Sequence, residues 1–371
     1  MASALLAVVS VEALSALLFN LLAAHIRFFD PTRFSPARDQ LEEMARSFDP
    51  DLGWRSRHAT PYGERPRPVR YDRPLLSTFG DSFTFCDEVK DHESWQTVLA
   101  ERLQADVYNF GNSAYGTDQA YLRFRQDFPR TRTPLVTLGF LTENINRLLN
   151  VYRKFYFDRT GVPLTKPRFS LEAGRLRLWP NPIRRVEDLP LLYDQTFLRQ
   201  LGEHDWWYNH ENLPVLQFPY SRILFDPRLW LKLYHVSVDD VAPRPWEDLW
   251  RDPEARALME AILDAFAREA KGEGATPVLM LFPERQDVEQ RVRGGDRGAA
   301  AHIRAFCDQH GYHCFDGVEA LARGVNGLEG IPPLYVTAHL SPAGNARIAE
   351  AFHEFLLAEG LIASGPDRRP S

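Results

Sequence analysis

Cysteine is scarce in this sequence. The 371 residues include only Cys86, Cys307 and Cys314, which is too few for a disulfide framework. Cys307 and Cys314 are close enough to pair in an oxidising compartment, so the sequence leaves the redox environment open. With His310 and His313 they could instead ligate zinc, but four ligands in so short a stretch would have to come from a helix end and the next strand. We therefore favour ordinary packing and predict no metal.

The sequence also lacks an excess of positive charge. It carries 44 basic and 50 acidic residues, a formal charge of −6, which gives no basic field to collect phosphates along a duplex. We therefore expect no nucleic-acid partner. Internal repeats and long low-complexity tracts are missing as well, and 44% apolar residues suffice for a sizeable core.

Charge is nearly absent from the first stretch of the chain, Ala2–Ile26, where Glu12 is the only formally charged residue. At about 1.5 Å per residue, a helix of this length could cross a hydrocarbon layer of about 30 Å. No Lys or Arg precedes the stretch and no clear cleavage signal ends it, which favours an uncleaved single-pass anchor over residues 1–27 rather than a signal peptide or a soluble amphipathic helix. Three arginines follow it, at Arg27, Arg33 and Arg38. The positive-inside rule would keep that side in the cytoplasm, so the topology stays open.

Beyond the anchor, a stalk or linker over 28–73 is rich in turn-forming residues and has no periodic pattern. Short apolar runs then alternate with amphipathic ones, which predicts an α/β domain with a parallel sheet and helices on both faces. Strands are predicted at 75–79, 106–110, 134–140, 276–282 and 312–316. Helices are predicted at 93–104, 117–127, 253–270, 298–309 and 342–358. The domain thus has a first part over 74–146 and a second over 251–360.

The alternation is interrupted over 147–250, which we predict to be an aromatic-rich insert. It contains six of the eight tryptophans: Trp179, Trp206, Trp207, Trp230, Trp246 and Trp250. We favour a core or interface role, with a carbohydrate platform and a lid at the membrane surface as alternatives. A hairpin is predicted to turn at Ala173–Gly174, and a disordered tail is predicted over 361–371.

Polar residues follow the predicted strands at the edge where open α/β sheets bind ligands. The first strand ends in Gly80-Asp81-Ser82, where glycine permits a tight turn and the next helix can direct N–H groups at an anion. A serine nucleophile needs a base within hydrogen-bond reach. His339 is the strongest candidate among eleven histidines because a helix start, Ser341-Pro342, follows it. The alternatives are that Ser82 only caps a helix and that His339 is satisfied by the backbone.

Four segments resemble, in chain order, the four blocks of the SGNH (GDSL-type) hydrolases. They are Gly80-Asp81-Ser82, the loop with Asn109, Gly111 and Gly116, the Glu143-Asn144 loop, and the segment around His339. The resemblance covers residues 75–358 and implies a three-layer, flavodoxin-like sheet and ester chemistry without a metal or organic cofactor. It implies that Ser82 is the nucleophile and His339 the general base. It also implies an oxyanion hole formed by the backbone N–H groups of Ser82 and Gly116 and the side chain of Asn144.

The second and third blocks depart from the family pattern. Counting from Asn109, the second-block glycine could fall on Ala114 instead of Gly116. In the third block, Glu143 falls on the usual asparagine and Asn144 one place later. We prefer Asn144, because a carboxylate cannot donate to an oxyanion.

The fourth block also departs from the pattern. The family usually has an aspartate two or three residues before the histidine, and here Val336 and Thr337 occupy those positions. Either a serine–histidine dyad is oriented by a backbone carbonyl or a distant carboxylate such as Glu143 or Asp316, or the site is degenerate.

Together these features predict a membrane-anchored serine esterase or O-acyltransferase with an extracytoplasmic catalytic domain. The resemblance to membrane-tethered family members associated with cell-surface polysaccharides implies a glycan O-acyl group, in particular O-acetyl, as the substrate. One alternative is a catalytically degenerate protein with a binding or assembly role in cell-surface polysaccharide processing. Another is an acyl hydrolase that faces the cytoplasm, as the three arginines after the anchor suggest.

Overall fold

The computed structural model describes residues 2–23, 25–26, 28–208, 213–230, 233, 249–295 and 298–363. The predictions that concern Arg27, Trp246 and the tail beyond residue 363 lie outside these ranges. The chain forms two compact units. The N-terminal unit comprises Met1–Phe48, Leu149–Thr165 and Pro182–Pro245, and the sheet unit comprises Asp49–Leu148, Lys166–Asn181 and Trp246–Ser371. The predicted insert is therefore divided between the two units.

A five-stranded parallel sheet forms the centre of the sheet unit. Its strands are β3 (Pro74–Gly80), β4 (Asp106–Gly111), β5 (Leu135–Phe140), β8 (Thr276–Leu281) and β9 (His313–Asp316). Every residue of β4 and β5 is buried, as expected for strands that helices cover on both faces. The strand order β4-β3-β5-β8-β9 is the flavodoxin-like order, whose switch point lies beside the first strand. The predicted three-layer α/β fold is confirmed.

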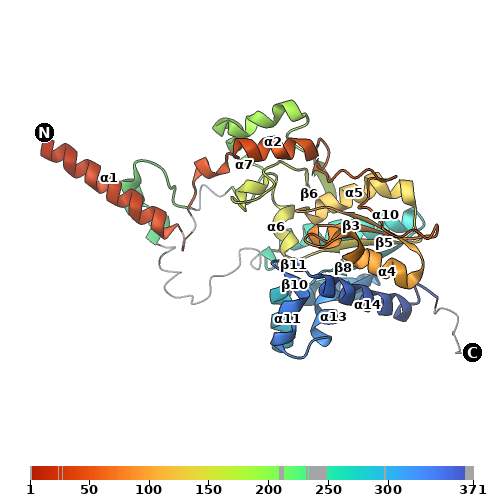
Figure 1. Cartoon of the computed structure of the whole chain (residues 1–371). Coiled ribbons are helices and arrows are strands. Elements are labelled where there is room, and N and C mark those ends of the chain that lie inside the picture. Colours follow the sequence, from red (N-terminus) through yellow and green to blue (C-terminus); the bar gives the residue numbers. More distant parts are fainter. Residues whose placement is uncertain are drawn as a thin grey trace, which may run out of the picture. The chain divides into compact units, whose positions relative to one another are not determined.

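Helices cover both faces of this sheet (Figure 1). On one face, α5 (Thr117–Thr131) packs on α10 (Pro253–Gly272), with the rings of Phe124 and Phe266 4.9 Å apart. On the other, α4 (Trp95–Leu103) packs on α14 (Pro342–Ala358), with Trp95 and Phe352 5.8 Å apart. The remaining longer helices are α11 (Arg285–Val292), α12 (Gly298–His310) and α13 (Gly317–Arg323).

The sheet unit contains two segments from outside the alternating pattern. Residues 49–73, which the sequence suggested were part of a stalk, belong to this unit and bury Trp54, Glu64 and Arg65. The hairpin of β6 (Arg168–Glu172) and β7 (Arg175–Trp179) turns at Ala173 and Gly174 as predicted, and both turn residues have positive φ angles.

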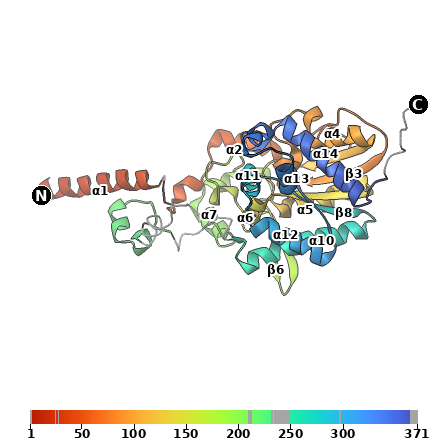
Figure 2. The same cartoon turned by 90° about the horizontal axis from the view of Figure 1, so that it is seen from below.

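The N-terminal unit begins with α1 (Ala2–Leu22). Among the described residues, α1 is the one helix that is long and apolar enough to cross a membrane, judged by length and composition. Figure 2 shows it as a straight helix. The other described helices of this unit are η1 (Pro31–Phe34), α2 (Arg38–Met44), η2 (Ala45–Ser47), η5 (Arg153–Phe155), η6 (Val186–Tyr193), α7 (Gln195–Gly202) and η7 (Tyr220–Phe225). An aromatic cluster fixes the elements that follow α1, since Phe34 and Phe155 lie 4.9 Å apart and Phe155 and Tyr208 4.8 Å apart.

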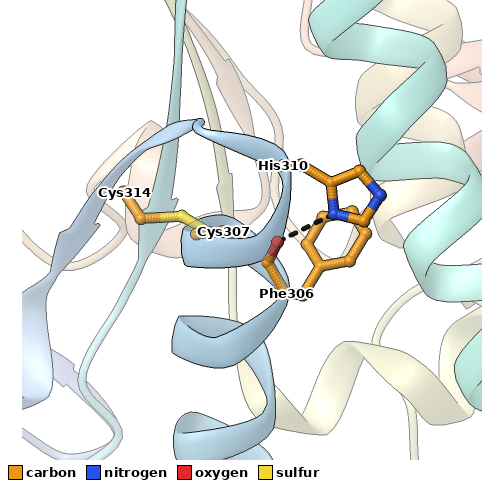
Figure 3. The surroundings of a disulfide bond; sticks show 4 residues. All are labelled: Phe306, Cys307, His310 and Cys314. Carbon is orange, nitrogen blue, oxygen red and sulfur yellow. Dashed lines mark hydrogen bonds between the residues drawn. A yellow bond between two sulfur atoms is a disulfide. The ribbon is translucent and has the colours of Figure 1, made fainter.

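A disulfide joins Cys307 in α12 to Cys314 in β9, with the two Cα atoms 6.2 Å apart (Figure 3). The ring of His310 points away from this bond, and its Nδ1 hydrogen-bonds the Phe306 carbonyl at 2.9 Å. His313 Nδ1 lies 2.7 Å from a Glu359 oxygen. Of the four side chains that the sequence had offered as zinc ligands, the two cysteines are thus joined to each other and each histidine has a partner of its own.

Candidate active site

Ser82 lies at the junction between the strand β3 and the helix that follows it. β3 ends at Gly80 and the short helix α3 (Ser82–Phe85) begins at once, capped by Asp81, whose Oδ1 accepts a hydrogen bond from the Phe83 N–H at 2.9 Å. Ser82 therefore does not cap α3. In the described part of the chain, neither its hydroxyl nor its backbone N–H makes a hydrogen bond, and the first N–H groups of a helix have no partner within the helix. Ser82 thus has the position expected of a nucleophile that also lines an anion site.

Three glycines allow α3 to pack directly on the ends of the strands. A Cβ atom at Gly111 would lie 2.2 Å from the Phe85 backbone nitrogen. Cβ atoms at Gly80 and Gly139 would lie 2.0 and 2.4 Å from Thr84 Oγ1. These glycines end β4, β3 and β5 or come one residue before the end. Their lack of a side chain sets the height of Ser82 above the sheet.

His339 comes to the same edge of the sheet from the far end of the sequence. It begins β11 (His339–Leu340), which pairs antiparallel with β10 (Tyr335–Val336). Its ring lies 5.2 Å from that of Phe83, the residue after Ser82. The structure thus brings the predicted base next to the residue that follows the predicted nucleophile, although no hydrogen bond joins Ser82 and His339 among the described residues. Catalytic hydrogen bonds are often long in unliganded enzymes.

Two carboxylates that the sequence analysis missed lie beside this histidine. Glu88 Oε2 is 3.6 Å from His339 Nδ1, and Asp87 Oδ2 is 3.9 Å from Nε2. Both distances are longer than a hydrogen bond and allow an ion pair once the ring is protonated. Burial raises the pKa of Asp87, while a hydrogen bond from Ser113 Oγ at 2.6 Å and the His339 charge oppose that shift. The Asp87 N–H also bonds the Ser82 carbonyl at 3.1 Å, which links this pair to the nucleophile.

The carboxylates suggested by sequence as orienting groups have other partners. Glu143 forms an ion pair with Arg147 at 2.6 Å. Asp316 pairs with Arg304 at 2.5 Å and caps α13. Both carboxylates thus have cationic partners of their own, and the carboxylates that the structure places beside His339 are Asp87 and Glu88.

Arg65 holds the loop that carries the two carboxylates. Its guanidinium donates hydrogen bonds to the carbonyls of Phe85 (2.5 Å), Cys86 (2.7 Å) and Val89 (2.6 Å), and to the Asp91 carboxylate (2.7 Å). A planar guanidinium is suited to several acceptors at once. Arg65 thereby fixes both ends of the loop around Asp87 and Glu88.

The same loop contains an unusual backbone. Cys86 and Glu88 have φ angles of +67° and +70°, and Thr337, whose hydroxyl donates to Glu88, has a φ of +42°. Residues with a side chain rarely adopt this left-handed region, and such strain gathers at functional sites. The observed strain therefore supports a functional role for this loop.

The second-block prediction needs correction. The Gly116 N–H donates to Gln119 Oε1 at 3.0 Å at the start of α5, so this group is engaged in the helix cap. Ala114 has a φ of +67°, the backbone shape that favours glycine. The structure therefore favours the alternative, in which Ala114 occupies the second-block position.

Asn144 lies in η4 (Thr142–Asn144), immediately after β5, and faces the turn that carries Ser82. Its Nδ2 donates to Asp81 Oδ2 at 2.8 Å. Burial raises the pKa of Asp81, and the charge of Arg147 and the Asn144 hydrogen bond counteract part of that effect. The amide has a second hydrogen, which no described residue accepts.

Comparisons with known proteins were made for the whole chain. A scan against protein-family models finds no match, and neither does a search of curated proteins. Solved structures with a similar fold include an α/β hydrolase enzyme from the Lake Arreo metagenome, with 16% identity over 78% of this chain and 97% of the other and a TM-score of 0.39.

Two further structures with a similar fold are named as a lipolytic protein and as an esterase. A member of the lipolytic G-D-S-L family from Veillonella parvula has 10% identity over 76% of this chain and 96% of the other, with a TM-score of 0.36. An acetylxylan esterase from Geobacillus stearothermophilus, solved as a catalytic mutant, has 14% identity over 78% and 95%, with a TM-score of 0.38. In this chain the strand order is flavodoxin-like, Ser82 begins α3, and the ring of His339 lies 5.2 Å from that of Phe83.

Proposed function

We propose that this chain is a membrane-anchored serine esterase or O-acyltransferase that acts on an O-acyl group, in particular the O-acetyl group of a glycan. One observation carries the proposal. The buried Ser82 is the first residue of α3 without being its cap, and His339 with two carboxylates beside it lies at the same edge of the sheet. In acyl transfer, a nucleophile, a base and an orienting acid act as a unit.

The proposed reaction begins when Ser82 Oγ attacks the acyl carbonyl carbon and its proton passes to His339. The Ser82 N–H and the second Asn144 amide hydrogen then donate to the carbonyl oxygen as it becomes negative. His339 returns the proton to the departing alkoxide, and the acyl group remains on Ser82. Water or an acceptor hydroxyl, deprotonated by His339, releases it. Neither route needs a metal or an organic cofactor.

The role we assign to Asp87 and Glu88 is to stabilise the imidazolium form of His339. A Glu88 oxygen lies 3.6 Å from one ring nitrogen and an Asp87 oxygen 3.9 Å from the other. When a bound substrate occupies the space beside one nitrogen, the carboxylate at the other nitrogen can move closer and form a hydrogen bond with the ring. This arrangement would replace the aspartate that the family usually carries before the histidine.

The proposed location is the extracytoplasmic face of a membrane, with α1 as the anchor. The Cys307–Cys314 disulfide supports this side, because disulfides persist in oxidising compartments and are rare in the cytosol. An alkaline phosphatase fused to the C-terminus should be active in cells. Activity of a cytoplasmic reporter at that position would contradict the assignment and would make a surface glycan an unsuitable substrate.

A fluorophosphonate probe tests the chemistry directly. We expect an adduct on the full-length protein, loss of that adduct in Ser82→Ala, and normal labelling in the control Ser56→Ala. The hydrogen bond of Ser56 to Asn112 uses its backbone N–H, which this substitution keeps. Release of acetate from an acetylated polysaccharide, compared with release from p-nitrophenyl acetate, then tests the glycan substrate.

A second candidate function is a non-catalytic binding or assembly role in polysaccharide processing. It is favoured by two observations: the Gly116 N–H is engaged with Gln119, and the carboxylates lie beyond hydrogen-bond distance from His339. A correctly folded protein that forms no Ser82 adduct and binds acetylated polysaccharide would establish this function in place of the esterase.

A further inference from the structure

The middle of α1 carries a carboxylate whose partner lies far along the chain. Glu12 is ten residues from each end of the helix Ala2–Leu22, and its side chain accepts a hydrogen bond from the Ser221 N–H at 3.3 Å and another from the Ser221 hydroxyl. An ionisable group within a membrane span is costly and is normally paired with another polar group. Ser221 provides that pairing, so the chain around it reaches the level of Glu12.

The segment Leu213–Trp230, which we call the flanking loop, packs along α1 from the level of Glu12 toward the C-terminal end of the helix. A buried apolar cluster joins Phe19 of α1 and Ile26 to Leu216, Ile223 and Leu229 of the loop. The loop is tied to the chain beyond α1 by two backbone hydrogen bonds, from the Phe29 N–H to the Pro214 carbonyl and from the Leu216 N–H to the Phe29 carbonyl. Both views show it beside α1 (Figures 1 and 2).

The outer side of the flanking loop is apolar and exposed. Phe218, Phe225 and Trp230 leave 71%, 85% and 56% of their surface uncovered. The part of α1 that the loop does not cover is equally bare, with Leu14 and Leu21 exposed by 66% and 63%. Exposed aromatic and aliphatic side chains that continue from the surface of a candidate membrane helix match the chemistry of lipid better than that of water.

The polar groups of the flanking loop are partly accounted for. In η7 and just after it, the Arg222 and Asp226 N–H groups bond the Pro219 and Ile223 carbonyls, which satisfies backbone that would otherwise meet lipid. Asp226 and Arg228 form an ion pair at 2.7 Å. Arg222 is exposed, and a long basic side chain can extend its charge toward a headgroup.

We propose that the flanking loop is a second membrane-embedded element, which enters the bilayer beside α1, reaches the level of Glu12 and returns. Its ligand is the lipid of the bilayer. This inference rests on the proposal that α1 anchors the chain, and it changes the anchor from a single helix to a helix with a re-entrant loop against it. The esterase chemistry is independent of it.

Spin labelling of the full-length protein in lipid nanodiscs tests the proposal. Single cysteines would replace Phe225 and Phe218 in the flanking loop, Leu14 in α1 and, as an aqueous control, Leu178 in the hairpin of the sheet unit, where 41% of the side chain is exposed. The native protein serves as the blank, because its free Cys86 is buried and its other two cysteines are paired. Power saturation then compares access of oxygen, which concentrates in lipid, with access of a water-soluble nickel chelate.

We expect labels at positions 225, 218 and 14 to favour oxygen several-fold over the nickel chelate, and the label at 178 to favour the chelate. Labels at 225 and 218 that behave like 178, while 14 reports lipid, would overturn the loop proposal and leave the anchor intact. Water access at 14 as well would overturn both. Protection of 225 and 218 from both reagents would show that protein, such as a second copy, covers the loop, and would also overturn the proposal.

Discussion

The charge of Glu88 offers the sharpest test of how His339 is oriented. In Glu88→Gln the side chain keeps its shape, and its remaining oxygen can still accept the Thr337 hydroxyl, so the change removes little except the charge. At the 3.6 Å that separates Glu88 Oε2 from His339 Nδ1, Coulomb's law gives about 1 kcal/mol in bulk water and about 5 kcal/mol at an effective dielectric constant of 20. The two side chains are 32% and 21% exposed, so solvent screening reduces the upper figure.

An intermediate value of about 2.5 to 3 kcal/mol corresponds to about a 100-fold loss of kcat/KM. The loss should appear in kcat with KM nearly unchanged, because the imidazolium forms only as the reaction proceeds. Hydrolysis of p-nitrophenyl acetate measures both constants. Asp87→Asn, at 3.9 Å, should show a similar loss. Glu101→Gln on the exposed surface of α4 is the matched control. Wild-type kcat/KM in both active-site variants would refute the idea that these carboxylates act on His339.

Five further changes, one of them a control, test the packing of the sheet unit by urea or thermal unfolding. Gly111→Ala should lower the free energy of unfolding by about 3 kcal/mol, because the added Cβ overpacks against α3. The control Gly272→Ala, with open space around it, should raise the free energy of unfolding by about 0.5 to 1 kcal/mol. Equal changes in the two variants would contradict the packing argument. Ala114→Gly should gain up to about 1 kcal/mol by relieving its positive φ, and a loss would count against that strain. Cys307→Ser should cost about 2.5 kcal/mol and make the melting temperature insensitive to reductant; an unchanged stability would show that the disulfide is not formed. Burial raises the pKa of Asp81 in the folded protein above its reference value of 3.8. The free energy of unfolding of the wild type should therefore fall as the pH rises through that folded-state pKa, while that of Asp81→Asn should not fall for this reason. A difference in unfolding free energy between the two proteins that does not change with pH would contradict the raised pKa.

The central fold could be predicted from sequence because its signal is periodic. The five strands fall within a residue or two of the predicted runs, since buried parallel strands are continuous apolar segments between amphipathic helices. The start of α14 was also readable, because Ser341 caps it and Pro342 is its first residue. Long irregular segments give no such signal, which is why the division of residues 147–250 between two units could not be foreseen.

The site was only partly predictable, for a physical reason that concerns the backbone. Ser82, Asn144 and His339 follow strands or precede a helix, so their positions derive from elements that sequence can locate. The placement of Glu88 depends instead on positive φ angles at Cys86 and Thr337 as well as its own. Residues other than glycine rarely adopt such angles, so the residue types at these positions do not predict them. The choice of Gly116 over Ala114 failed for the same reason.

The hydrogen bonds of residues 49–73 also decide what a minimal catalytic fragment must contain. Arg65 grips the loop after α3, while Trp54 Nε1 donates to the Ser113 carbonyl at 2.9 Å and the Tyr115 hydroxyl donates to the Trp54 carbonyl at 2.6 Å. A soluble fragment that starts at Pro74 would retain all four motif blocks and still lose the residues that brace two of their loops. A fragment that starts at Asp49 would keep them. The motif residues therefore begin at Gly80, whereas a fragment that keeps their supporting hydrogen bonds has to begin at Asp49.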